Sequence, residues 1–188
     1  MNSEIINFAK DIFPFKNLKE KTIQILLSEI DVSVSSFLKG ETVFSKDNYH
    51  KTVGFVMDGE CEVERERADG DCISLNTLKK YASFGILSVF SPDAEFPTLI
   101  KAVKASKVMF ISGDDMISII KKYPTVSMNV ITFLSGRIAF LNKKVETFSG
   151  KSTVDKLATY LMNKFKEHGN EITVTRTKLS AELGVGRA

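Results

Sequence analysis

A long apolar repeat between Val126 and Phe148 constrains the fold of this chain more than any other feature. Apolar residues follow one another there at alternating spacings of three and four, which is the a/d repeat of a seam between two helices. We therefore predict a dimerisation helix over residues 126–149. Its predicted dimer interface consists of Ile131, Leu134, Ile138, Leu141, Val145 and Phe148.

A second apolar line runs beside this repeat and comprises Val126, Val130, Phe133 and Phe140. Residues at such spacings share one face of a helix, so we expect this line to face the chain's own domain while the repeat faces a partner. A helix buried throughout the core of a monomer also carries apolar residues around much of its circumference. That alternative stays open on the sequence alone.

The composition suits a globular protein with one large and one small domain. The chain has 188 residues, of which 43% are hydrophobic and 26% are charged. No apolar run approaches the roughly 18 residues of a membrane span, and the N-terminus mixes acidic and apolar residues, unlike a signal peptide. We expect a cytoplasmic protein without a membrane partner.

The excess of positive charge lies in the C-terminal part of the chain. Residues 1–148 contain 19 basic and 19 acidic side chains, whereas residues 149–188 contain 7 basic and 4 acidic ones. This distribution indicates that the C-terminal part meets a polyanion.

The residues before the long helix divide into a helical start and a β domain. One helix is predicted over residues 3–12 and a second from a cap at Asn17 to about residue 30. Residues 32–111 contain short runs of Val, Ile, Phe and Thr between turn signals, and Asp69-Gly70 joins two strands of a hairpin. A short helix is predicted to begin at Gly113-Asp114, and Pro124 leads into the long helix.

A further helix follows the long one, with Ser152 and Asp155 spaced as a capping box and Gly169 at its end. Residues 171–174 are predicted to form a strand. We place a domain boundary between residues 149 and 150. The apolar face of this helix is expected to be buried and consists of Val154, Leu157, Ala158, Leu161, Met162 and Phe165.

The last residues, TRTKLSAELGVGRA, carry the pattern of a helix-turn-helix. A capping Thr175 precedes the first helix, the small Ser180 suits a close helix crossing, and Gly184 suits the tight turn. The pattern continues through Arg187, and the recognition helix is incomplete within these 188 residues. The candidate DNA-binding residues are Thr175, Arg176, Ser180, Gly184 and Arg187.

This order of elements, together with the FGILSVF segment at residues 84–90, resembles the Crp/Fnr family of bacterial transcription regulators. The resemblance implies an α+β fold with a jelly-roll-like β-barrel sensor domain over residues 1–125, similar to cyclic nucleotide-binding domains. It further implies a dimerisation helix over 126–149 and part of a winged helix-turn-helix domain over 150–188. A homodimer, double-stranded DNA, RNA polymerase and a small-molecule effector are the partners it implies.

The chain departs from the cyclic-nucleotide-binding members of that family. Those members carry a Gly-Glu pair that binds the ribose and an Arg-Ser pair that binds the phosphate, whereas this chain has Gly85-Ile86 and Phe96-Pro97. A buried phosphate without a charged partner costs several kcal/mol, and Pro97 also removes a backbone donor. We therefore expect no binding of cyclic AMP or cyclic GMP. Lys101 or Lys104 would be a replacement cation, although strand lysines are more often solvated.

An effector is expected between the FGILSVF and EFPTLI segments and the long helix. The sequence does not identify it. An equal alternative is that these apolar side chains fill the position of the nucleotide pocket and are part of the protein core. The candidate lining is Gly85, Ile86, Leu87, Phe96, Pro97, Thr98, Leu141 and Asn142.

The chain lacks the side chains that other cofactors or an enzyme activity would require. Two cysteines, Cys61 and Cys72, are too few for a four-cysteine iron–sulfur cluster, and isolated strand cysteines usually pack. His50 and His168 are predicted in turns, which argues against a haem ligand. They lie 118 residues apart, which argues against the metal site of a double-stranded β-helix enzyme. We expect a regulator that is not an enzyme; the alternative is a regulatory or ligand-binding dimer without DNA binding.

Overall fold

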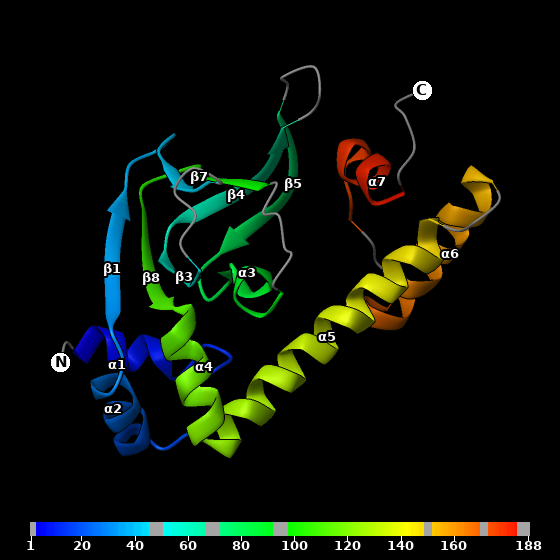
Figure 1. The fold of residues 1–188 in the computed structure, drawn as a ribbon. Helices are drawn as coiled ribbons and strands as arrows, with labels where there is room; N and C mark the ends of the chain where they lie inside the picture. The colour runs from blue at the N-terminus through cyan, green and yellow to red at the C-terminus, as the bar shows by residue number, and fades with distance from the viewer. Residues whose placement is uncertain are drawn as a thin grey trace. The chain divides into compact units, whose positions relative to one another are not determined.

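The structure is a computed structural model that describes residues 3–45, 51–66, 72–91, 98–148, 152–169 and 173–183 (Figure 1). The contacts within the chain define two compact units, residues 1–130 and 131–188. No helix among the described residues is both long enough and apolar enough to cross a bilayer.

Two short helices open the first unit, α1 (Ser3–Ala9) and α2 (Glu20–Ser28). The predicted cap at Asn17 is wrong: α2 begins after Lys19, and Asn17 instead adopts a left-handed turn with a φ of 64°. Asparagine tolerates this conformation better than most residues, so a turn competes with the cap here.

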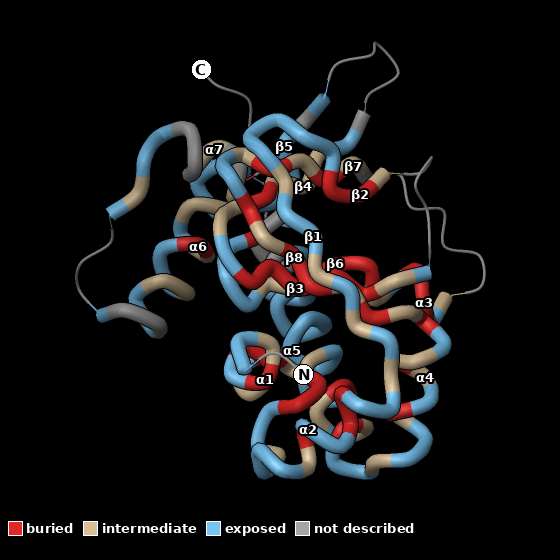
Figure 2. The backbone as a smooth tube through the Cα atoms, turned by 90° about the vertical axis from the view of Figure 1, so that its left-hand side faces the viewer, coloured by how far each residue is buried: buried red, intermediate tan, exposed pale blue. Residues whose placement is uncertain are grey.

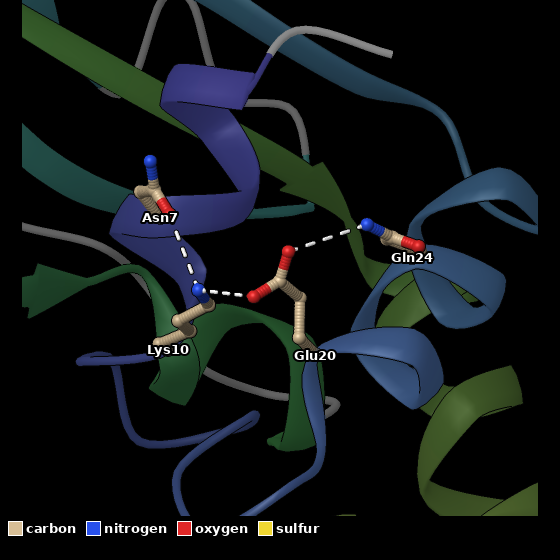
Figure 3. A network of polar contacts seen from close by, with 4 residues as sticks. All are labelled: Asn7, Lys10, Glu20 and Gln24. Atoms are coloured by element: carbon tan, nitrogen blue, oxygen red, sulfur yellow. Dashed lines mark hydrogen bonds and ion pairs between the residues drawn. The ribbon is translucent and has the colours of Figure 1, made fainter.

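A polar network links the two helices at the surface (Figure 3). The Lys10 ammonium donates to Glu20 Oε2 at 2.6 Å and to Asn7 Oδ1 at 3.2 Å, and Gln24 Nε2 lies 3.5 Å from Glu20 Oε1. Because these side chains are exposed, the ion pair contributes at most about 1 kcal/mol. The helices are held mainly by the apolar residues beneath.

Within the described residues, eight strands form two four-stranded antiparallel sheets, ordered β1-β8-β3-β6 and β2-β7-β4-β5. The predicted α+β, jelly-roll-like fold is confirmed, but across the described strands the two sheets do not close into a barrel. Asp69-Gly70 lies outside the described residues, although the strands it was predicted to join do pair as β4 and β5. The strands are β1 (Val32–Phe37), β2 (Thr42–Phe44), β3 (Thr52–Asp58), β4 (Glu60–Glu66), β5 (Cys72–Lys79), β6 (Ser83–Phe84), β7 (Thr98–Ala102) and β8 (Ser106–Ser112).

Strands β3 and β8 consist largely of buried residues (Figure 2). Their side chains belong to two apolar clusters, one on each face of the strands. Phe55 of β3 and Met109 of β8 belong to the cluster beneath the helices. Val56 and Val108, one residue away on each strand, belong to the cluster between the sheets. The two-residue period of a strand explains this division.

Two helices follow the sheets, α4 (Gly113–Lys122) and α5 (Pro124–Phe148). The predicted helix start at Gly113 is confirmed, and Ser112 caps it by accepting a 3.0 Å hydrogen bond from the Asp115 backbone N–H. The first turns of α5 are fixed to the first unit, because Val126 and Val130 are buried in the core. Asn129 Nδ2 also donates to the Lys16 carbonyl at 2.6 Å.

The second unit contains the rest of α5, together with α6 (Thr153–His168) and α7 (Arg176–Leu183). The predicted capping box is confirmed, with Ser152 N to Asp155 Oδ2 and Asp155 N to Ser152 Oγ both at 3.1 Å. Thr173 and Val174 are not in a strand, contrary to prediction, and residues 170–172 lie outside the described part.

The predicted burial of the apolar face of α6 is mostly wrong. Leu157 is half-buried, but the side chains of five other residues on this face are exposed: Val154, Ala158, Leu161, Met162 and Phe165. Helix α7 contacts α6, and Tyr160 of α6 and Leu183 of α7 are buried. At a rise of about 1.5 Å per residue, α7 is about half as long as α6 and covers only part of its length.

Candidate sensor segment and dimerisation surface

The residues that follow β5 in the first unit, 83–91, are termed the sensor segment here and comprise β6, Gly85 and α3 (Ile86–Phe90). Gly85 has a φ of +81°, and a Cβ atom there would lie 2.2 Å from the carbonyl oxygen of Thr52. Both the left-handed backbone and the close approach require glycine. The segment is therefore pressed against the start of β3.

Phe84, the residue before this glycine, points into the cluster between the sheets. Its ring packs directly on Gly54, where a Cβ atom would lie 2.1 Å from the ring. The rings of Phe44 and Phe110 meet it edge to face, with centroid distances of 5.7 and 6.0 Å. Such edge-to-face pairs add to the apolar burial.

Helix α3 turns one side inward and the other to solvent. Ser88 is buried, and its hydroxyl donates to the Gly85 carbonyl at 2.6 Å. Ile86 is partly buried against the core beneath the helices. Leu87 and Phe90 are exposed. Ile86, at the position where nucleotide-binding relatives are expected to carry a carboxylate, is thus an apolar packing residue.

The described structure does not test the other predicted pocket residues as a group. Phe96 and Pro97 lie outside the described residues, and Thr98 is the first residue of β7. Leu141 and Asn142 are exposed on α5 in the second unit. The effector pocket therefore remains a prediction.

Lys101 and Lys104, the candidate replacement cations, are each paired with a carboxylate. Lys101 Nζ lies 2.9 Å from Glu64 Oε2, and Lys104 Nζ lies 3.3 Å from Glu60 Oε2. The hydrogen bond to Glu64 raises the pKa of Lys101. Each of the two lysine charges is thus compensated by a carboxylate within the chain.

The thiol and imidazole candidates do not form a site among the described residues. Cys61 is buried and Cys72 is exposed, and both are free. Burial raises the pKa of the Cys61 thiol, which disfavours the thiolate that binds metals. His50 lies outside the described residues, and His168 is the last residue of α6. The described residues contain no cluster of three or more potential metal ligands.

The predicted interface residues of α5 are exposed in the single chain. Ile131, Ile138, Leu141 and Val145 are 54–61% exposed and Leu134 is 38% exposed. The side chain of Phe148, the last residue of α5, is outside the described part. These exposures contradict the alternative of a helix buried throughout a monomer.

The second apolar line of α5 is buried only at its start. Val126 and Val130 lie in the core, as predicted, and Phe133 is half-buried. Phe140 is 50% exposed and belongs to the second unit, so its packing against the sensor domain stays a prediction. The first unit ends at Val130, and the burial of α5 declines beyond it.

The candidate DNA-binding residues that the structure describes lie in α7 or directly before it. Thr175 immediately precedes this helix and accepts a 2.8 Å backbone hydrogen bond from Leu179. Arg176 is exposed and Ser180 is half-buried, while Gly184 and Arg187 lie outside the described residues. Residues 131–188 contain ten basic and five acidic side chains, so the second unit carries the positive charge of the chain.

Part of the first unit is similar to a known protein family. Residues 34–123 match the family of cyclic nucleotide-binding domains. A global nitrogen regulator of Nostoc sp. is 23% identical over 138 residues, which cover 72% of this chain and 61% of that protein. The chain thus spans about three fifths of the length of this curated relative.

Solved structures share the fold. The catabolite activator protein of Thermus thermophilus has a TM-score of 0.63 at 19% identity, covering 92% of this chain and 80% of that one. The sensor domain of the transcriptional regulator DNR from Pseudomonas aeruginosa has a TM-score of 0.59 at 16% identity, covering 70% of this chain and 91% of that one. At these identities the likeness shows the fold.

Proposed function

The chain resembles the Crp/Fnr family of transcription regulators, and from this premise we propose that it acts as a dimeric, DNA-binding transcription regulator in the bacterial cytoplasm, without enzyme activity. Its sensor domain spans residues 1–125, its dimerisation helix residues 126–149 and its DNA-binding part residues 150–188. The observation that carries the proposal is the row of exposed apolar side chains on α5.

The α5 repeat supports a second copy of this chain as the partner. Apolar residues at a and d positions are costly to expose, and a parallel copy would offer the same side chains to cover them. A monomer would leave the whole row in water, at about 1.5–3 kcal/mol for each large side chain that a dimer could fully bury.

The sensor domain of the proposed regulator has lost cyclic-nucleotide recognition. Ile86 supplies no carboxylate for a ribose, and Lys101 and Lys104 are already paired with glutamates. The domain either binds another small effector or binds none.

DNA binding is assigned to the second unit, whose basic side chains suit phosphate contacts. Arg187 falls where the resemblance implies a guanine contact, worth about 1–3 kcal/mol of base discrimination; a phosphate contact is the alternative. RNA polymerase is a further partner that the resemblance implies.

The test is fluorescence anisotropy with duplex DNA at several salt concentrations. The 188 residues are expected to bind weakly, without sequence preference and with a steep loss of affinity as salt rises. Joined to a complete recognition helix and wing, they should select a palindrome with half-sites about 34 Å apart from a randomised library.

An exposed cation of the second unit provides the specific variant. Arg176→Ala should weaken binding to all duplexes alike and reduce the salt slope by about one. Lys16→Ala, in the first unit, should leave binding unchanged and serves as the control.

Absence of any duplex binding at low salt, or of any selected palindrome, would favour a regulatory dimer that does not bind DNA.

A further inference from the structure

A strained residue lies at the turn that leads into the sensor segment. Tyr81 has a φ of +71°, and the Ala82 backbone N–H donates to the Lys79 carbonyl at 2.8 Å, which closes a four-residue turn. Tyr81 is the third residue of this turn. A positive φ there is usually supplied by glycine or asparagine, because other side chains clash with their own backbone. A tyrosine thus occupies a turn position whose backbone conformation disfavours it.

The tyrosine ring makes a contact that glycine could not make. It stacks on the ring of Phe8 in α1, with a centroid distance of 5.4 Å and an interplanar angle of 13°. The Lys80 ammonium lies 5.2 Å from the Tyr81 ring centroid, within cation–π range. Tyr81 is 42% exposed, whereas Phe8 is only 6% exposed. The stack joins the N-terminal helix to the strained turn.

The turn sets the register of β6 and thereby the position of α3. The Tyr81 N–H donates to the Val56 carbonyl at 2.8 Å, and the Val56 N–H donates to the Ala82 carbonyl at 2.9 Å. Immediately afterwards Ser83 pairs with Phe55, and Phe84 pairs with Gly54. Gly85 and α3 follow without an intervening loop, so a change at the turn is passed directly to the sensor segment.

Helix α1 is itself fixed at its other end. The Lys107 ammonium of β8 contacts both carboxylate oxygens of Glu4, at 2.7 and 2.8 Å. Ile6 and Ala9 are buried in the core beneath the helices. The helix thus runs from an anchor on β8 to the stack on Tyr81.

We propose that α1 is a strap that holds the Tyr81 turn in its strained conformation and so fixes the sensor segment in place without any ligand. A regulatory role for this strap rests on the proposed function, in which residues 83–91 respond to an effector. Release of Phe8 lets the turn relax, and β6 and α3 loosen with it. An effector or partner that displaces α1 would act on the sensor by this route.

Hydrogen exchange of the intact chain tests the strap. Phe8→Leu keeps an apolar side chain in the core but removes the stacked ring. Amides of residues 82–90 should then exchange about tenfold faster, while those of β4 and β7 change by less than about twofold, as expected for local opening. Phe15→Leu is the control, because it makes the same change at another buried phenylalanine of the cluster beneath the helices. This variant should leave the amide exchange rates of residues 82–90 within about twofold of wild type.

A rescue variant separates strain from ordinary packing. Tyr81→Asn removes the ring but accepts a positive φ, so adding it to Phe8→Leu should return the exchange of residues 82–90 to within about threefold of wild type. If Phe8→Leu alone does not fold, the double variant should fold. Failure of this rescue, or a uniform increase in exchange across the first unit, would overturn the strap. Neither result depends on dimerisation or DNA binding, which are measured separately.

Discussion

The Lys101 ammonium and the Glu64 carboxylate lie 2.9 Å apart on the neighbouring strands β7 and β4. The Glu64 side chain is 16% exposed, so the pair is partly withdrawn from water. A lysine held in this way is not available to an anionic ligand without leaving Glu64 unpaired. This ion pair is one reason to expect that cyclic nucleotides do not bind.

Cyclic AMP and cyclic GMP should not bind measurably. The side chain of Ile86 offers no acceptor to a ribose hydroxyl, and the cation at residue 101 is already compensated. Calorimetric titration at millimolar nucleotide should show no saturable heat. A micromolar dissociation constant for either nucleotide would show that the phosphate is bound by groups other than those considered.

Gly85→Ala should destabilise the first unit by about 2–4 kcal/mol. The substitution combines a positive φ with a Cβ atom 2.2 Å from the Thr52 carbonyl oxygen. Gly40→Ala is the matched control, because Gly40 has a φ of +88° but a Cβ atom added there would have nothing within 4 Å; it should cost only about 1 kcal/mol. Urea denaturation measures both, and equal losses would contradict the close contact at Gly85.

The carboxylate of Glu29 should give the chain an acid-dependent contribution to stability. Lys122 Nζ donates to it at 2.6 Å and the Tyr123 hydroxyl at 2.9 Å, and these bonds lower the pKa of Glu29, that from Lys122 most. The unfolded carboxyl therefore binds its proton at a higher pH than the folded one. The contribution is present above the ordinary pKa of 4.5 and is lost as pH falls through the lower, folded value.

Glu29→Gln measures this contribution. Its melting temperature should lie below that of wild type at pH 7, and the difference should shrink as pH falls below 4.5 and the Glu29 carboxyl of wild type takes up its proton. Lys122→Met should show the same convergence, because it removes the other partner. A difference that stays constant from pH 7 to pH 3 would exclude the ion pair as its cause.

The sequence predicted those elements whose signals are local. The capping box at Ser152, the helix start at Gly113 and the a/d repeat of α5 each depend on residues a few positions apart, and the structure contains all three helices. The order of strands in the two sheets joins residues far apart in the chain, such as Val32 and Ile111, and no local pattern specifies it.

The sequence was less informative where two local conformations compete or where packing decides. Asn17 suits both a cap and a left-handed turn, and the structure contains the turn. The apolar face of α6 predicts burial, but burial depends on the elements that cover it, and Phe165 is 55% exposed. Tyr81 carries no sequence signal for a positive φ, since its conformation depends on the stack with Phe8.

The central claim is that the exposed row on α5 pairs two copies of the chain, and sedimentation equilibrium of a double variant tests it most directly. Leu134→Asp with Leu141→Asp places charges in the centre of the seam, where a dimer would bury them unpaired. The control, Thr132→Asp with Ala139→Asp, has the same spacing on an exposed face of α5 outside the repeat. We predict that wild type and control are dimers and the Leu134/Leu141 variant a monomer. A variant that remains fully dimeric would contradict this claim.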